Sequence, residues 1–152
     1  MKQKLNIPRY LELVAEEKKY DKQNKVFFEE DKEAFLELLN YRANVECQIS
    51  YAKKDIYFSL VENYLTEKIT SDKFRADFLD LQDQDSKDGT NILNDLEKLS
   101  TFSISLNAIE FSSLLIDVYN CSMIVMEEEG LSETEFRDSI ERIFQKLSEF
   151  ID

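Results

Sequence analysis

Carboxylates are the only residues abundant enough in this chain to suggest chemistry. Of the 152 residues, 32 are Asp or Glu and none is His. Without His the chain lacks the usual general base and the commonest metal ligand, so a His-based Ser or Cys triad is excluded. The two glycines, Gly89 and Gly130, are too few for a Gly-rich phosphate loop. We therefore expect no catalytic site and no cofactor.

The carboxylate patterns fit a metal site poorly. A four-helix carboxylate site of the ferritin type requires Glu-x-x-His pairs. Asp83-x-Asp85 has the first spacing of a calcium loop, but the downstream Gly and Glu positions do not match. An acid–base pair such as Glu62 and Glu67 stays open as an alternative, although a solvated helix face is the simpler interpretation. We expect no metal site.

The acid is concentrated in the second part of the chain. Residues 1–54 carry 11 Lys and Arg against 10 Asp and Glu, a net charge of +1, whereas residues 55–152 carry 8 against 22, a net charge of −14. Such a surface repels nucleic acid and anionic membranes and attracts basic surfaces. We therefore divide the chain into an N-terminal helical extension, 1–54, and an acidic helical bundle, 55–152. The expected partner is a basic protein, with no direct nucleic-acid contact.

Composition and spacing predict an all-α fold, a compact antiparallel bundle of five to seven helices. Two glycines and one proline are too few for the turns of a sheet. Pro8 suits the first turn of a helix over 8–20. No Gly or Pro interrupts 26–69, which is either one long helix or two with a kink near 44–50. Thr70-Ser71-Asp72 is a helix start, in which a Ser or Thr caps the next helix and the Asp complements its dipole.

Further along the chain, polar residues and Gly89 predict a central loop over 82–90, before another helix near 92–99. Residues 106–126 are apolar on most sides and predict the central helix of the core. Ser132-x-x-Glu135 is a capping box, with Leu131 and Phe136 as its hydrophobic staple. The apolar face of the last helix then continues for about four turns.

Two acidic clusters are the candidate partner-binding residues. The first, in the predicted central loop, consists of Asp80, Asp83, Asp85 and Asp88. The second precedes Gly130 and consists of Glu127, Glu128 and Glu129. The alternative for each cluster is a solvated surface that keeps the protein dispersed.

The opening residues 1–10 are polar and basic, so no secretory signal is visible. No apolar run approaches the ~18 residues of a membrane span, so no membrane insertion is expected. These observations favour a cytoplasmic location, in which Cys47 and Cys121 are expected as thiols rather than a disulfide. The oligomeric state stays open.

A family resemblance covers roughly residues 55–150. An amphipathic segment ends in Lys68-Ile69, a Thr70-Ser71 cap follows, and Phe74-x-x-x-Phe78-Leu79 opens the next helix. Together with the acidic lead into Phe136-Arg137, this order resembles the bacterial colicin D-type immunity proteins. The resemblance implies a helical bundle that neutralises a basic, tRNase-like nuclease toxin by covering its active cleft with carboxylates.

A second interpretation belongs to another functional class. Here the chain is a non-catalytic helical adaptor or assembly factor that binds a protein partner. The extension favours it because it is rich in aromatic residues, namely Tyr10, Phe27, Phe28, Phe35, Tyr41 and Tyr51. The alternative for these aromatics is that they pack on the bundle as parts of additional helices.

Overall fold

The computed structural model describes residues 2–96, 102–124 and 130–151. Within these ranges the chain forms seven α-helices and one antiparallel pair of very short strands, so the predicted all-α fold of five to seven helices is confirmed. In chain order the elements are β1 (Lys2–Lys4), α1 (Ile7–Lys22), α2 (Phe27–Glu30), α3 (Lys32–Ala52), α4 (Lys54–Leu65), α5 (Ser71–Asn94), β2 (Ser103–Ser105), α6 (Leu106–Ile124) and α7 (Glu133–Leu147), followed by a 3₁₀ turn (Ser148–Phe150).

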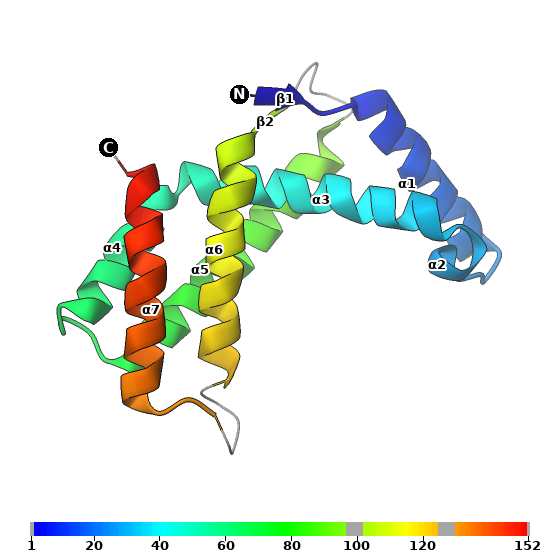
Figure 1. Ribbon diagram of the computed structural model, residues 1–152. Coiled ribbons are helices and arrows are strands. Elements are labelled where there is room, and N and C mark those ends of the chain that lie inside the picture. The colour runs from blue at the N-terminus through cyan, green and yellow to red at the C-terminus, as the bar shows by residue number, and fades with distance from the viewer. Residues whose placement is uncertain (1, 97–101, 125–129, 152) are drawn as a thin grey trace.

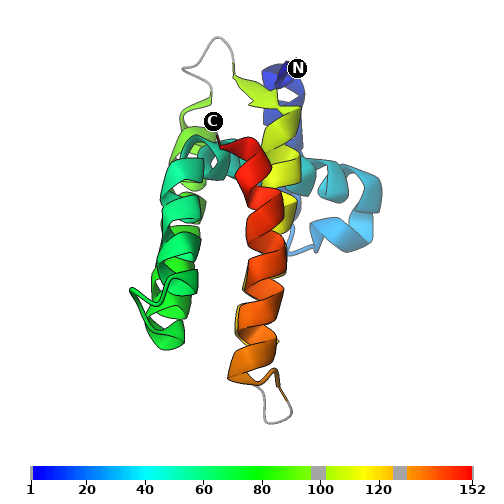
Figure 2. The ribbon, with the colours of Figure 1, turned by 60° about the vertical axis from the view of Figure 1, so that its left-hand side comes forward.

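The helices form a two-layered bundle with an arm. α4 and α5 make one layer, α6 and α7 make the other, and Figure 2 shows the two layers side by side. α3 crosses one end of the bundle and packs against both α5 and α6, while α1 and α2 pack on the part of α3 that projects from the bundle (Figure 1). α3 is therefore the element that joins the arm to the bundle.

Two clusters of buried apolar side chains hold these layers together. The bundle core lies between α4, α5, α6 and α7 and consists of Tyr57, Val61, Tyr64, Phe74, Phe78, Phe111, Leu115, Val118, Phe136, Ile140, Ile143 and Leu147. The arm core lies around α1 and α3 and consists of Leu5, Ile7, Tyr10, Leu13, Phe27, Ala34, Leu38, Val45, Leu96 and Ile104. Burying aromatic and aliphatic side chains of this size is the main source of stability in both clusters.

The N-terminal caps predicted from the sequence are present. Pro8 lies in the first turn of α1, where a missing N–H costs no hydrogen bond. The Thr70 hydroxyl accepts a hydrogen bond from the Lys73 N–H at 3.2 Å at the start of α5. The Ser132 hydroxyl accepts one from the Glu135 N–H at 3.1 Å at the start of α7. Each cap satisfies one of the free N–H groups that begin a helix.

The stretch 26–69 forms three helices, so both predicted alternatives, one long helix and two helices with a kink near 44–50, are wrong. α2 ends at Glu30, and the Asp31 carboxylate then caps α3 by accepting from the Ala34 N–H at 3.1 Å. The chain turns again at Lys53, between α3 and α4. α4 ends with Glu67 in the left-handed region at φ 62°, where the Lys68 N–H reaches back to the Asn63 carbonyl at 2.8 Å, as in a Schellman motif.

The predicted central loop over 82–90 is wrong, because α5 runs without interruption from Ser71 to Asn94. Gly89 lies inside this helix and is buried where α5 crosses α3. A Cβ at this position would lie 3.8 Å from the Cα of Glu46. This is an ordinary contact distance, so Gly89 marks neither a turn nor a helix crossing that requires glycine.

The strand pair lies outside what the sequence predicted. β1 and β2 pair antiparallel with Gln3 opposite Ile104, and the Leu5 N–H extends the pairing to the Phe102 carbonyl at 2.7 Å. Cys47 and Cys121 are free thiols, as expected. Among the described helices none is both long and apolar enough to cross a membrane.

Candidate functional site

The four carboxylates of the first acidic cluster lie on different sides of α5. Asp85 and Asp88 face α3 and α4, whereas Asp80 and Asp83 point outward. Asp85 is fully buried, and its carboxylate accepts hydrogen bonds from the Ser50 hydroxyl at 2.7 Å and from the Lys53 ammonium at 2.7 Å. The Tyr57 hydroxyl also donates to it at short range. Asp85 therefore joins the end of α3, the start of α4 and the middle of α5.

Asp88 extends this network by one helical turn toward the surface. Its carboxylate lies 3.1 Å from the Lys53 ammonium and accepts from the Gln84 amide at 2.9 Å. These two contacts, that of Gln84 first, lower the pKa of Asp88. The hydrogen bond to Asp85, together with that to Asp88, raises the pKa of Lys53 against the effect of burial.

Tyr57 completes the network from the α4 side. Its hydroxyl accepts from the Gln82 amide at 2.9 Å while it donates to Asp85. Burial, and then the adjacent Asp85 carboxylate, raises its pKa. Because each polar group has a partner inside the protein, the network fixes the turn between α3 and α4 and offers little to a ligand.

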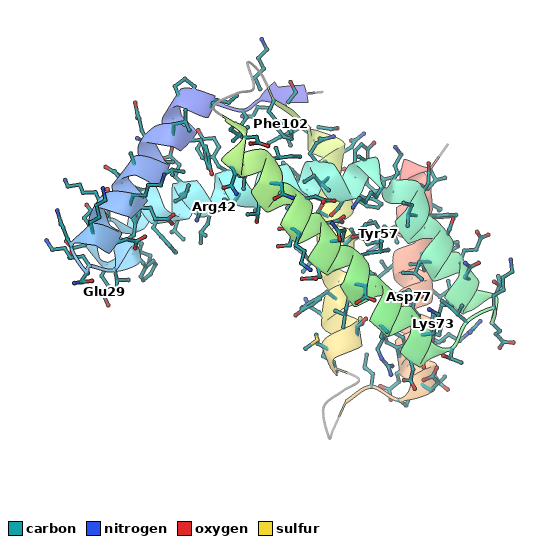
Figure 3. All side chains as sticks on the ribbon, turned by 180° about the vertical axis from the view of Figure 1, so that it is seen from behind. Glu29, Arg42, Tyr57, Lys73, Asp77 and Phe102 are labelled. Carbon is teal, nitrogen blue, oxygen red and sulfur yellow. The ribbon has the colours of Figure 1, made fainter. Side chains whose placement is uncertain are left out.

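The other two carboxylates of the cluster point outward. Asp83 is exposed and pairs with Lys87 one turn along α5 at 2.8 Å, an arrangement that contributes little to stability. Asp80 lines a surface groove between α4 and α5. Figure 3, seen from behind, shows this side of the bundle, with Tyr57, Lys73 and Asp77 labelled.

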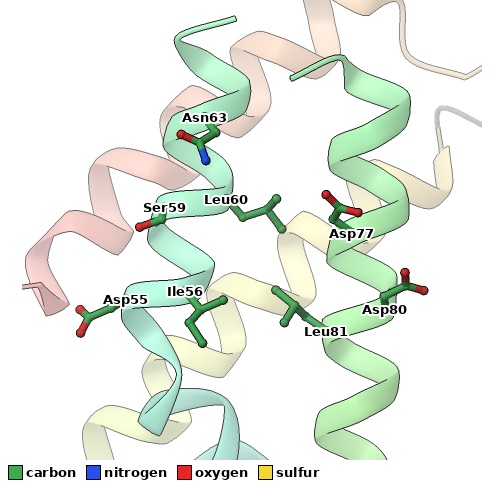
Figure 4. Close-up of a pocket in the computed structure, with 8 residues that line it drawn as sticks. All are labelled: Asp55, Ile56, Ser59, Leu60, Asn63, Asp77, Asp80 and Leu81. Atoms are coloured by element: carbon green, nitrogen blue, oxygen red, sulfur yellow. The ribbon is translucent and has the colours of Figure 1, made fainter. Parts of the chain in front are cut away.

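The groove has an apolar floor and an acidic border. Its volume is about 680 Å³, and Ile56, Leu60 and Leu81 point toward one another across the space between the two helices (Figure 4). Ile56 is 53% exposed, so its aliphatic side chain is accessible to a partner. The remaining lining residues are polar, namely Asp55, Ser59, Asn63, Asp77 and Asp80. We call this surface the acidic groove.

Among the residues that the structure describes, no Lys or Arg lines the acidic groove. Asp77 is paired with Lys73 at 3.0 Å along the outer side of α5. Asp55 and Asp80 have no ion pair within the described residues. Two of the three carboxylates are thus left to attract a positive charge.

The second predicted cluster, Glu127, Glu128 and Glu129, lies outside the described residues. Of the sequence candidates, the acidic groove contains Asp80 alone. Sequence reasoning missed Asp55, Asp77 and Ile56. Spacing along the chain was the useful signal, because Asp77, Asp80 and Leu81 lie three and four residues apart on the helix predicted to begin near residue 70.

Comparison of the chain with models of known protein families, with curated proteins and with solved structures finds no match. The functional argument therefore depends on this chain's own geometry. Within the described residues, no three His, Cys, Asp or Glu side chains are grouped closely enough to hold a metal ion. What the acidic groove can do is bind, because its apolar floor takes aliphatic groups while its carboxylates accept hydrogen bonds from cations.

Proposed function

We propose that this chain is a non-catalytic binding protein whose acidic groove takes a basic segment of a protein partner. The observation that carries the proposal is the combination of exposed Ile56 with the unpaired carboxylates of Asp55 and Asp80. Lys and Arg side chains suit such a surface, because their aliphatic stems pack on apolar groups while their charged ends reach carboxylates.

The charge of the whole chain supports the same partner. A net charge of −13, most of it carried by residues 55–152, accelerates the approach of a basic surface and disfavours nucleic acid. Once the partner is in place, desolvated pairs at the groove determine how slowly it leaves. Steering and retention are thus assigned to different residues.

The partner that fits best is a basic, tRNase-like nuclease toxin, which would make the chain an immunity protein. The active cleft of such an enzyme binds phosphates, so it must present cations. Carboxylates of this chain at the phosphate positions would occupy the cleft but offer no phosphodiester bond to cleave. The resemblance of residues 55–150 to colicin D-type immunity proteins supports this proposal.

The second candidate is a helical adaptor. A separate row of exposed apolar side chains along α6 favours it, because an adaptor needs two docking surfaces. The two candidates differ in their consequence for the partner. An immunity protein abolishes a nuclease activity in stoichiometric amounts, whereas an adaptor leaves its partner active.

Affinity capture at low and high salt identifies the partner, which is then purified for equilibrium binding. The groove variant carries Asp55→Asn, Asp77→Asn and Asp80→Asn. The control variant carries Asp83→Asn, Asp138→Asn and Glu149→Gln, which remove the same charge from exposed positions outside the groove. We expect the groove variant to bind about tenfold or more weakly, and the control to lose only several-fold.

Equal losses in the two variants would contradict the proposal, because binding would then depend on overall charge. Inhibition of RNA cleavage by the partner separates the immunity role from the adaptor role. A partner that lacks nuclease activity would favour the adaptor.

A further inference from the structure

α6 carries a second surface, on the opposite side of the bundle from the acidic groove. Ile109, Ile116 and Met123 recur every seven residues on its exposed side, and Leu106 continues the row. In Figure 1 this helix faces the viewer, with no described segment in front of it, whereas α4 and α5 lie behind. Residues seven apart lie on nearly the same side of a helix, so these side chains form one row along α6, with the polar residues Ser113 and Asn120 at the intervening positions. We call this row the α6 seam.

A small pocket opens beside the seam where α6 meets α3 and α5. Its volume is about 170 Å³, and Ile116 belongs both to the pocket wall and to the seam. Ala43 and Leu115 add apolar wall, while Glu46 and Ser112 add polar groups. We call it the corner pocket.

Two polar groups of the corner pocket have unused hydrogen-bonding capacity. Ser112 is 8% exposed, and its hydroxyl has no hydrogen-bond partner within the described residues. Glu46 likewise has no ion pair there, and burial followed by the nearby Asp85 carboxylate raises its pKa. A buried hydroxyl and a half-buried carboxylate without partners are each costly, and a cation that donates hydrogen bonds would satisfy both.

We propose that the α6 seam docks one amphipathic helix of a partner protein, and that a Lys or Arg of this helix enters the corner pocket to pair with Glu46. The aliphatic stem of that residue lies against Ala43, Leu115 and Ile116. Its charged end donates to the Glu46 carboxylate and the Ser112 hydroxyl. The inference is independent of the acidic groove, which lies on the other side of the molecule.

Charge favours a basic helix over a second copy of this chain. α6 carries Glu110 and Asp117 and no Lys or Arg. Two antiparallel copies with Leu106 opposite Met123 would bring Glu110 close to Asp117 of the second copy, in chains that each carry a charge of −13. A basic helix meets attraction at the same positions.

Cys47 lines the corner pocket and allows a direct test of its preference for a cation. The Cys121→Ser protein is equilibrated in separate reactions with cystamine and with bis(2-hydroxyethyl) disulfide. In each reaction the Cys47 thiolate attacks one sulfur, a mixed disulfide forms and one equivalent of small thiol leaves. Intact mass then gives the fraction that carries an aminoethyl or a hydroxyethyl group.

The Cys47→Ser protein, which reacts at Cys121, measures the preference at a thiol that lies beside Asp117, Arg142 and Lys146, so the deciding comparison is the change that Glu46→Gln makes at Cys47. The preference is the ratio of aminoethyl to hydroxyethyl product. We expect this ratio to be about threefold to fivefold higher at Cys47 than at Cys121, and we expect Glu46→Gln to remove the difference. The same ratio at both cysteines, or an excess that survives Glu46→Gln, would overturn the cation pocket.

A designed peptide of three Leu/Lys heptads, with one Lys within its Leu stripe, tests the docking of a helix. Anisotropy is measured at about 0.5 M salt, where screening leaves little long-range attraction. We expect Ile116→Ser to weaken binding about tenfold and Ile56→Ser, in the acidic groove, to leave it unchanged. Equal effects of the two changes would overturn the proposal, as would a dimer in sedimentation that Ile116→Ser dissociates.

The outcomes separate this inference from the proposed function. If the peptide and disulfide tests fail while partner binding still depends on the acidic groove, only the proposal for the α6 seam is wrong. If partner binding does not depend on the acidic groove while the tests at Cys47 and Ile116 succeed, only the proposed function of the groove is wrong.

Discussion

At the scale of single residues, Asp85 connects more of the molecule than any other carboxylate in the first acidic cluster. It is fully buried and contacts Ser50, Lys53 and Tyr57 from two other helices. A buried charge is tolerated only when partners replace the water it has lost. Removing the carboxylate therefore leaves three donors without their acceptor.

We expect Asp85→Ala to lower the free energy of unfolding by about 3–5 kcal/mol, the range for breaking a buried pair. Asp85→Asn should cost less, because the amide oxygen still accepts one hydrogen bond. Urea unfolding measures both changes. Asp83→Ala, at an exposed position of the same helix, is the control and should stay within about 0.5 kcal/mol. An Asp85→Ala cost as small as the control would mean that the network adds no stability.

The sequence pointed to Asp85 as a residue of interest but assigned it the wrong surroundings. Its position among Asp80, Asp83 and Asp88 suggests exposure, because most runs of charge are solvated. Asp85 is buried because α3 and α4 place Ser50 and Tyr57 against it, residues that lie 35 and 28 positions earlier in the sequence. No local pattern encodes a contact of that sequence separation.

Glu46 gives the chain a dependence of stability on pH with an unusual sign. Its pKa is raised above 4.5 in the folded state, first by burial and then by Asp85. The folded protein thus holds this proton more tightly than the unfolded chain does. The contribution of Glu46 is fully present below about pH 4.5 and is lost as the pH rises through the higher folded pKa.

We therefore expect Glu46→Gln to raise the melting temperature at about pH 7, and the difference from wild type to vanish near pH 4. Calorimetry across this range is the measurement. Glu62→Gln, on the exposed side of α4, is the control for the loss of one charge. A variant that is less stable than wild type at neutral pH would show that the charged carboxylate has a stabilising partner.

At the scale of the elements, α5 is the helix that most affects the interpretation of the site. The helix caps at Thr70 and Ser132 and the apolar face of α7 follow from local rules, and the sequence predicts them correctly. The prediction of a loop over 82–90 was wrong because it used the local preferences of Asp, Ser and Gly, which favour loops. Packing against α3 outweighs that preference, since Asp85 and Gly89 are buried in this part of α5.

The continuity of α5 makes Gly89 a test position. Gly89→Ala should raise the free energy of unfolding by about 0.5–1 kcal/mol, because Ala has the better helix propensity. The added Cβ would lie 3.7 Å from the Ile49 side chain and 3.8 Å from the Glu46 backbone, both ordinary contacts. Urea unfolding gives the value. Destabilisation instead would indicate a backbone that requires glycine, as the loop interpretation assumed.

At the scale of the whole molecule, charge and packing divide the chain differently. The charge changes near residue 54, but α3 packs on α5 and α6 and supplies Ser50 and Lys53 to the Asp85 network. Two Arg–carboxylate pairs, Arg9 with Glu37 and Arg42 with Glu17, bind α1 to the same helix. The sequence shows where the charge lies, but it does not show that α3 makes contacts on both sides of residue 54, because these contacts form only in the folded chain.

We expect a fragment of residues 55–152 to lose cooperative unfolding, because Asp85 would be buried with neither Ser50 nor Lys53. A fragment of residues 32–152 retains α3 and should unfold cooperatively, although at lower urea concentration than the full chain. Circular dichroism during urea unfolding compares the three proteins. If 55–152 unfolded as sharply as the full chain, the acidic bundle would be an independent domain.

The strand pair has a consequence for the order of events during synthesis. Lys2–Lys4 leave the ribosome before Ser103–Ser105, their only partners among the described strands, which follow about a hundred residues later. At typical translation rates of about 5–20 residues per second, β1 waits roughly 5–20 s before it can pair. Throughout that interval the nascent arm depends on the contacts between α1 and α3. The edge of β1 is therefore exposed throughout that interval, and its Lys-Gln-Lys sequence is well suited to keep it from pairing with other chains.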